Sequence, residues 1–190
     1  MAMARGDVIG HPIGDLADHV QGAWWWAHEV RAGRLPELTS VTHFPAQLRL
    51  WFVDPVGAAL ALPFWAAGAA VAWNLVLFIQ VLATLVVGYV TGRDLSGRRI
   101  GGLATATVVG ASPYVLGLLH SGISEYVGLA PLVGAAWALL RVSGRDPRGR
   151  PAPRWMALVA GGLIAFSGLQ AAYYGAFAGL LALCCLPGQG

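Results

Sequence analysis

Four long apolar stretches, separated by short polar loops, dominate the chain. They cover residues 71–90, 100–119, 126–140 and 155–186. A helix of about 20 apolar residues is long enough to cross the hydrocarbon core of a bilayer. Only 11% of the residues are charged and 57% are hydrophobic, whereas ordinary soluble domains carry about 25% charged residues. The sequence therefore predicts an all-α, polytopic transmembrane bundle with about 4–6 membrane helices.

Two apolar segments do not fit a simple upright span. Residues 56–70 form a short stretch that contains Pro63, so we expect a re-entrant or surface helix there. Residues 155–186 are too long for one upright helix, and Ser167-Gly168 and the stretch at 170–175 offer a break. The second segment is therefore predicted to form either one long tilted helix or two shorter ones.

The beginning of the chain is much more polar than the rest. Six of the nine acidic residues and four of the five histidines lie within residues 1–54. The chain is therefore predicted to divide into an acidic loop with an interfacial helix, residues 1–55, and a transmembrane bundle, residues 56–190. We expect any chemistry to lie in the first of these parts.

Arginine placement predicts the topology. The loops at 92–99 and 141–154 carry three and five arginines, and loops rich in basic residues stay on the cytoplasmic side. The acidic loop and the short loop at 120–125 are then extracytoplasmic. Because these arginines are explained by topology, the basic pI of the chain does not indicate a nucleic-acid partner.

An amphipathic helix is predicted within the acidic loop. It would run over residues 16–32, with Asp15 as its N-cap and Gly33 after its last turn. At about 100° per residue the side chains separate into two sides. The polar side would hold Asp15, Asp18, His19, Trp26 and Glu29, and the apolar side would hold Leu16, Val20, Ala23, Trp24 and Ala27. This pattern is typical of a helix that lies in the membrane interface.

The acidic cluster at the start of this helix is the strongest candidate site. Asp15 and Asp18 are three residues apart and so face the same way. Such a pair can act as a general base, hold a divalent cation such as Mg²⁺ or Mn²⁺, bind the polar part of a substrate, or simply cap and solvate the helix. The neighbouring His19 could bind substrate. Arg31 and Arg34 could bind phosphate groups, or could pair with local acids or lipid head groups.

Polar residues also flank the short loop at 120–125. His120 begins it and Glu125 ends it, next to an apolar stretch. An ionisable residue at such a place is costly and is often functional, although an acid also suits the start of any helix. Both residues are candidates for substrate binding. Asp54, which precedes Pro55, is read as a helix-start signal.

Several short motifs together resemble a known family. They are GDLADH at 14–19, the Ala-Gly-Arg-Leu-Pro segment at 32–36, Trp-Phe-Val-Asp-Pro at 51–55, Asn74, and HSGISE at 120–125. The segment at 6–180 resembles the N-terminal part of GT-C type membrane glycosyltransferases, the class that includes protein mannosyltransferases and aminoarabinose transferases.

This resemblance implies a function, a location and a set of partners. It implies a multi-pass protein of the bacterial inner membrane, surrounded by membrane lipid, that takes sugar from a polyprenyl-phosphate carrier. Asp15 or Asp18 would be the catalytic acid that deprotonates the acceptor hydroxyl or helps to bind a metal, and Glu125 would lie near the site. The family has a membrane helix before its acidic loop and further spans after the similar part, so the chain could be a fragment of such an enzyme.

A non-catalytic integral membrane protein is the alternative. A degenerate fragment, a scaffold or a transporter-like protein would share the composition and the apolar stretches. Transporters usually place ionisable residues or broken helices at mid-membrane, and the predicted spans contain almost no ionisable residues.

Overall fold

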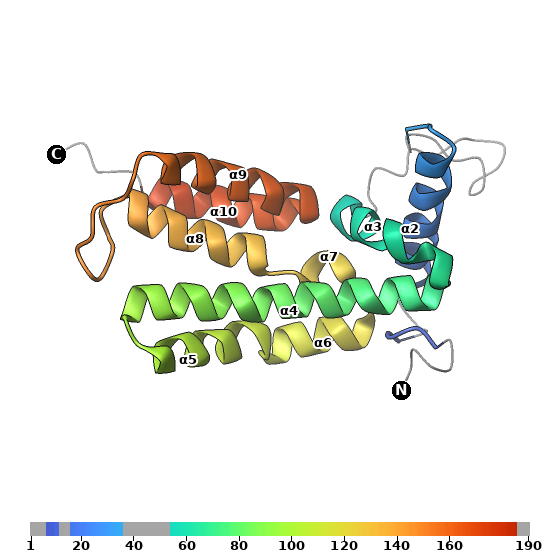
Figure 1. Ribbon diagram of the computed structural model, residues 1–190, viewed down its shortest axis with the longest axis horizontal. Helices are drawn as coiled ribbons and strands as arrows, with labels where there is room; N and C mark the ends of the chain where they lie inside the picture. The colour runs from blue at the N-terminus through green and yellow to red at the C-terminus, as the bar shows by residue number, and fades with distance from the viewer. Residues whose placement is uncertain (1–6, 12–15, 36–53, 186–190) are drawn as a thin grey trace. The chain divides into compact units, whose positions relative to one another are not determined.

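The computed structural model describes residues 7–11, 16–35 and 54–185, and its regular structure within these ranges is entirely helical (Figure 1). This confirms the all-α prediction. Two helical stretches, Ala69–Ser96 and Ser124–Val142, are long and apolar enough to cross a membrane. A third would join Arg99–Gly110 and Pro113–Ser121, which are bent by 42° at a short break.

Contacts divide the chain into two compact units. The first contains residues 1–78 and 118–125, and the second contains residues 79–117 and 126–190. In the first unit, helix α2 (Leu16–Arg31) packs against α3 (Pro55–Ala61) and the 3₁₀ helix η1 (Leu62–Ala67). This packing groups α3 and η1 with α2 in one contact unit, and the domain boundary at residue 55 stays a prediction.

Helix α2 begins and ends close to its predicted limits. Gly33 adopts a φ of +70°, the left-handed conformation that glycine supplies after a helix. The Gly33 N–H donates to the Val30 carbonyl and the Arg34 N–H donates to the Glu29 carbonyl. These two bonds form a Schellman motif and satisfy carbonyls that the end of a helix leaves open.

The predicted division of α2 into two faces is wrong in part. His19, expected on the polar side, is only 9% exposed, and its ring centroid lies 6.3 Å from that of Trp73. Trp24, expected on the apolar side, is 43% exposed, while its neighbour Trp25 is 3% exposed. The buried side of α2 also contains Gly22, Ala23 and Ala27. Small residues allow helices to approach closely, so packing against α3 and η1, rather than average hydropathy, decides which side of α2 is buried.

The predicted helix start at Asp54 and Pro55 is confirmed. Asp54 is the N-cap of α3 and Pro55 is its first residue, the position where the missing proline N–H costs nothing. The short helical segment continues through η1 and ends at Gly68, which has a φ of +104°. Residues 56–70 therefore contain two short helical pieces and the start of α4, and their placement as a re-entrant or surface helix stays a prediction.

Helix α4 (Ala69–Ser96) is longer than its predicted range of 71–90. The polar residues at 91–96, expected to form a loop, continue the helix until Gly97, whose φ is +71°. Polar residues are compatible with the last turns of a helix, and only the glycine interrupts it.

Helices α5 (Arg99–Gly110) and α6 (Pro113–Ser121) divide the span predicted at 100–119 into two bent parts. The break falls just before Pro113, which disfavours helical backbone in the preceding residue. Glycines bring α5 against α4. A Cβ atom added to Gly92 would lie 2.4 Å from the Gly101 carbonyl oxygen, and one added to Gly88 would lie 3.1 Å from the Ala106 Cα. The glycine-rich sequence thus allows the close helix contact that it predicts.

Helices α9 (Trp155–Gln170) and α10 (Ala172–Cys185) settle the alternative left open for the last apolar stretch. Ala171 between them has extended backbone, with a φ of −151°. Both helices pack against each other and against α8 (Ala130–Val142), which follows the short α7 (Ser124–Val127). The Gly175 backbone approaches that of Gly168 so closely that a Cβ atom on Gly175 would lie 2.7 Å from the Gly168 Cα.

A matched pair of glycine substitutions tests the contact between α4 and α5. Gly92→Ala is expected to destabilise the protein by about 1–3 kcal/mol, because its methyl group meets backbone that cannot move aside. Gly161→Ala in α9, where a Cβ atom meets nothing within 4 Å, is expected to be neutral or stabilising by up to about 1 kcal/mol. Thermal unfolding in detergent, followed by circular dichroism, measures both. Equal effects at the two positions would contradict the packing.

Candidate functional site

The start of the chain is held in place by a buried amide in the first unit. The backbone N–H of Ile9 donates to Asn74 Oδ1 at 2.7 Å, and Asn74 Nδ2 donates to the Asp7 carbonyl at 2.8 Å. Asn74 is fully buried. One side chain of α4 therefore satisfies two backbone groups of the segment 7–11 and fixes its position, which gives a structural role to a residue that the resemblance singles out.

The same segment lies against residues 120–125. The sequence predicts a loop there, but His120 and Ser121 end α6, Ser124 and Glu125 begin α7, and only residues 122–123 are non-helical. A Cβ atom on Gly122 would lie 2.8 Å from the Ile9 carbonyl oxygen and 2.6 Å from the Leu16 Cδ1. Gly122 also has a φ of +73°, which favours glycine for a second reason. The rings of His11 and His120 lie with their centroids 5.8 Å apart. The structure thus brings together the start of α2, the segment 7–11 and the loop, which are far apart in the sequence.

A buried carboxylate ties this loop to α3. Asp54 is 2% exposed; its Oδ1 accepts a hydrogen bond from the Gly57 N–H at 2.7 Å, and its Oδ2 accepts one from Ser124 Oγ at 2.7 Å. Buried charges require such donors, because burial without them is costly. Asp54 and Ser124 therefore serve the structure of the site, by fixing the start of α7.

The predicted site residues near this loop differ in their surroundings. Asp18 is exposed in the first turn of α2 and has no hydrogen bond or ion pair within the described part of the chain. His19 is buried against Trp73. His120 is exposed, and Glu125 is half-buried in the first turn of α7. Asp15, the other predicted catalytic acid, lies outside the described residues.

Arg34 is engaged by an acid of its own helix. Its Nε and one terminal nitrogen donate to the two carboxylate oxygens of Glu29, at 2.7 and 2.8 Å. The hydrogen bond from Arg34 lowers the pKa of Glu29, and the carboxylate in turn raises the pKa of Arg34. Of the two alternatives that the sequence leaves open for Arg34, the structure shows the local ion pair.

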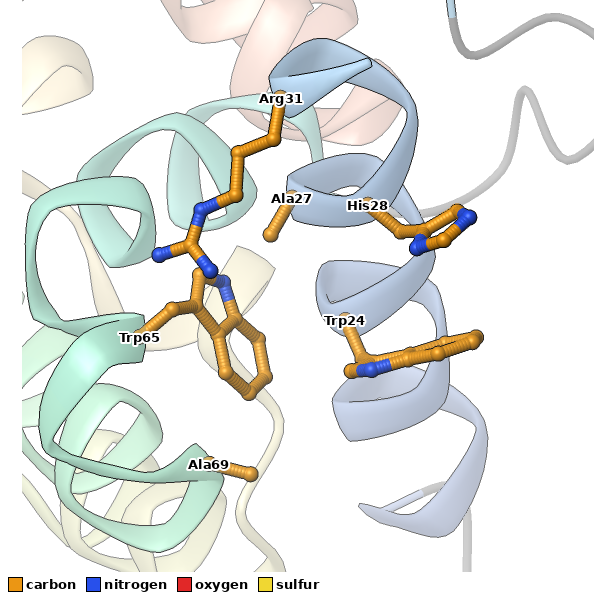
Figure 2. Close-up of a pocket in the computed structure, with 6 residues that line it drawn as sticks. All are labelled: Trp24, Ala27, His28, Arg31, Trp65 and Ala69. Atoms are coloured by element: carbon orange, nitrogen blue, oxygen red, sulfur yellow. The ribbon is translucent and has the colours of Figure 1, made fainter.

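Arg31 lies in a different environment, a cavity with a volume of about 290 Å³ (Figure 2). The cavity is lined by Trp24, Ala27, His28, Arg31, Trp65 and Ala69. Figure 2 shows the Arg31 side chain reaching from α2 toward Trp65 of η1. Within the described ranges Arg31 has no ion pair, and the buried Trp65 Nε1 has no hydrogen-bond acceptor.

The aromatic side chains make this cavity suited to a polar ring or an anionic group. The rings of Trp24 and His28 stack at a centroid distance of 5.5 Å. A guanidinium and an indole N–H can donate to phosphate or hydroxyl oxygens, and tryptophan faces offer apolar area. Arg31 can be identified from the sequence, whereas Trp65 cannot, because only the packing of η1 on α2 brings Trp65 to the same place.

Arg31 and Asp18 do not belong to one small site. They are 13 positions apart on α2, which corresponds to about 20 Å along the helix axis. Even with the arginine extended, their functional groups cannot contact the same few atoms. The predicted substrate-binding residues therefore do not form one site. His120 and Glu125 lie within residues 120–125, Arg31 lines its own cavity, Arg34 is paired with Glu29, and His19 is buried.

The divalent cation predicted at Asp15 and Asp18 needs several ligands in one place. Among the described residues no three His, Cys, Asp or Glu side chains gather to hold a metal ion. Asp18 would supply one carboxylate, and its expected partner Asp15 is not among the described residues. Metal binding stays a prediction, and no step proposed below uses it.

A second charged cluster, in the second unit, joins the end of α4 to the loop after α8. Asp94 accepts hydrogen bonds from Trp137 Nε1 at 2.8 Å, from Arg141 at 3.0 Å and from two nitrogens of Arg150 at 2.7 and 2.9 Å. Arg150 Nε also donates to Asp146 at 2.8 Å. We call these five residues the arginine clamp.

The arginine clamp gives part of the basic loop a structural role. The hydrogen bond from Arg150 lowers the pKa of Asp146, whose side chain is 1% exposed, and the two carboxylates raise the pKa of Arg150. From the sequence, the arginines at 141–154 indicate only the topology. The segments 92–99 and 141–154 contain eight arginines and only two acids, Asp94 and Asp146. Two acids in such basic segments are the sequence signal for ion pairs with the arginines.

Comparison with known proteins adds nothing to the description of the site. Comparison of the chain with models of protein families, with curated proteins and with solved structures finds no match.

Proposed function

We propose that the chain is a GT-C-like membrane glycosyltransferase, or a fragment of one, that transfers sugar from a polyprenyl-phosphate donor to an acceptor hydroxyl. One observation carries the proposal. The start of α2, which bears Asp18, lies beside the loop 120–125, with Leu16 next to Gly122 and His11 next to His120. These are the two segments, about one hundred positions apart, that the resemblance to GT-C enzymes assigns to the site.

Asp18 is the described residue best suited to act as the base. Its carboxylate is exposed and, within the described ranges, has no hydrogen-bond or ion-pair partner. In the proposed reaction the acceptor hydroxyl gives its proton to Asp18 or Asp15, and its oxygen forms a bond to the anomeric carbon. The bond from that carbon to the phosphate oxygen breaks, and the polyprenyl phosphate leaves with the electron pair.

His120 is proposed to bind the donor phosphate. It is exposed beside His11, and an imidazole N–H can donate to a phosphate oxygen. His19, which is buried against Trp73, would position α2 rather than touch the phosphate. Glu125, in the first turn of α7, would complete the polar edge of the site.

The cavity of Arg31 is proposed to hold a more distant part of the substrate. At about 20 Å from Asp18 along α2, its arginine cannot neutralise the phosphate that leaves during transfer. Its two tryptophans and its guanidinium would instead bind a sugar ring or an anionic group of an extended acceptor.

The proposed setting is the bacterial inner membrane, with the polar head outside the cytoplasm. The two long apolar helices, the bent pair α5 and α6, and the shorter apolar helices α9 and α10 support a total of 4–6 membrane segments if all of them insert. The arginine-rich ends of α4 and α8 would face the cytoplasm, and membrane lipid would cover the exposed apolar side chains.

A substitution of Asp18 tests the proposed chemistry. Asp18→Asn keeps the size of the side chain but cannot accept the proton, so sugar transfer by the longest natural form of the protein is expected to fall by about 10²–10⁴-fold. Glu29→Gln, on the same helix but paired with Arg34, is the matched control and is expected to keep its activity. Transfer is measured with a radiolabelled polyprenyl-phosphate sugar in proteoliposomes. Undiminished transfer by both Asp18→Asn and Asp15→Asn would overturn the assignment.

A non-catalytic scaffold is the second candidate. It is favoured by the structural use of Asn74, Asp54 and Ser124, since each of these buried polar groups already has a partner within the protein. A folded protein that retains the polyprenyl-phosphate donor in mass spectrometry but transfers no sugar would support this role. Transfer that depends on Asp18 would exclude it.

A further inference from the structure

The second unit contains a cavity at the end of α4 that is separate from the candidate catalytic residues. Its volume is about 370 Å³, and it is lined by Tyr89, Val90, Arg93, Asp94, Gly97 and Arg148. Two exposed arginines, one from α4 and one from the loop after α8, thus border the same hollow.

The arginine clamp leaves these two arginines free to bind an anion. Asp94 and Asp146 are engaged by Arg141 and Arg150. Within the described part of the second unit, neither Arg93 nor Arg148 has a carboxylate partner. Arg148 is held by hydrogen bonds from its backbone N–H to Asp146 and from its guanidinium to the Asp94 carbonyl, at 3.2 and 3.3 Å. Its remaining guanidinium donors stay available at a fixed position.

An apolar strip leads away from this cavity along α4. Val90, which lines the cavity, is 51% exposed, and Val86 and Leu82 are 52% and 47% exposed. These residues are four positions apart, so they form one line on the helix surface. The strip would accommodate a hydrocarbon chain whose polar end lies between the two arginines.

We propose that this cavity binds an anionic phospholipid, with the head-group phosphate between Arg93 and Arg148 and an acyl chain along Val90, Val86 and Leu82. Guanidinium groups bind phosphate through charge and paired hydrogen bonds. Basic cavities at the cytoplasmic ends of membrane helices are the usual places for such head groups. Free phosphate would satisfy the arginines but would leave the apolar strip unused. The site is independent of the proposed sugar transfer.

Native mass spectrometry of the full chain in neutral detergent tests the site, with phosphatidylglycerol and phosphatidylcholine of identical acyl chains titrated as probes. Arg93→Gln combined with Arg148→Gln is expected to weaken phosphatidylglycerol binding by about tenfold or more, because each arginine near a lipid head group contributes substantially to binding. Arg98→Gln combined with Arg99→Gln removes the same charge from exposed arginines outside the cavity and is expected to weaken it by less than about threefold. Arg93→Gln alone, which disturbs no described hydrogen bond, should show an intermediate loss.

Three results would overturn the proposal. Equal weakening by both double variants would mean that diffuse charge attracts the lipid. Equal binding of phosphatidylcholine and phosphatidylglycerol to the unaltered protein would mean that the phosphate charge is not recognised. Displacement of phosphatidylglycerol by an equal concentration of inorganic phosphate would mean that the apolar strip contributes nothing and that the ligand is a free anion.

Discussion

Asp94→Ala is expected to lower the free energy of unfolding by about 3 kcal/mol. The carboxylate accepts hydrogen bonds from Trp137, Arg141 and Arg150. Its removal leaves Arg141, whose side chain is only 10% exposed, with a single longer ion pair to Asp146 at 3.5 Å. Breaking a partly buried charge cluster at one member is costly because the others keep their charge without compensation. Thermal unfolding in detergent, followed by circular dichroism, measures the loss.

The exposed pair between Arg34 and Glu29 supplies the control for this prediction. It has bidentate geometry like the pair of Arg150 and Asp94, but the Arg34 side chain is 57% exposed. Solvent-exposed ion pairs contribute about 0–1 kcal/mol, so Glu29→Ala should leave the unfolding temperature nearly unchanged. A double-mutant cycle of Asp94→Ala and Arg150→Ala isolates the coupling between the clamp residues. A coupling energy near zero would show that they do not act together.

Asp54→Ala is expected to destabilise the first unit by about 2–4 kcal/mol. The substitution removes the N-cap of α3 and leaves the Gly57 N–H and the Ser124 hydroxyl without their acceptor in a buried place. Each of these losses costs free energy separately, since a buried donor without a partner is more costly than a missing bond. The same unfolding measurement, combined with hydrogen exchange at the start of α3 and α7, detects the change.

Two conservative variants separate the capping and the loop contributions of Asp54. Asp54→Asn keeps an oxygen that can accept from Gly57, and its amide can donate to the Ser124 oxygen, so less than half of the loss is expected. Ser124→Ala removes only the contact between α7 and the cap and should cost about 1–2 kcal/mol. If Asp54→Ala and Ser124→Ala had the same effect, the cap itself would contribute nothing.

Local signals in the sequence predict some helix limits correctly. Gly33 and Asp54-Pro55 mark an end and a beginning, because left-handed backbone and a proline at the first helical position have few alternatives. The predicted loop at 91–96 is wrong, since polarity alone does not end a helix and Gly97 does. The span predicted at 100–119 is not one continuous helix, because the break before Pro113 is a local backbone effect that the apolar pattern hides.

The candidate site is predicted only in part. The sequence identifies Asp18, His120 and Glu125 as polar residues in unusual positions, and the meeting of their two segments depends on Asn74 and Gly122. These two residues act through hydrogen bonds and close backbone contact between segments that are distant along the chain. No periodic pattern reports such contacts.

The sequence by itself determines that this protein is helical and rich in long apolar segments, because composition and hydrophobic length act residue by residue along the chain. Only the tertiary structure decides which charges are paired and which face of α2 is buried. Arg141 and Arg150 are engaged by Asp94, and Arg93 and Arg148 are left to border a cavity. His19 is buried while Trp24 is exposed. Pairing and burial depend on distances between residues that are far apart in the sequence, and those distances exist only after the helices have packed.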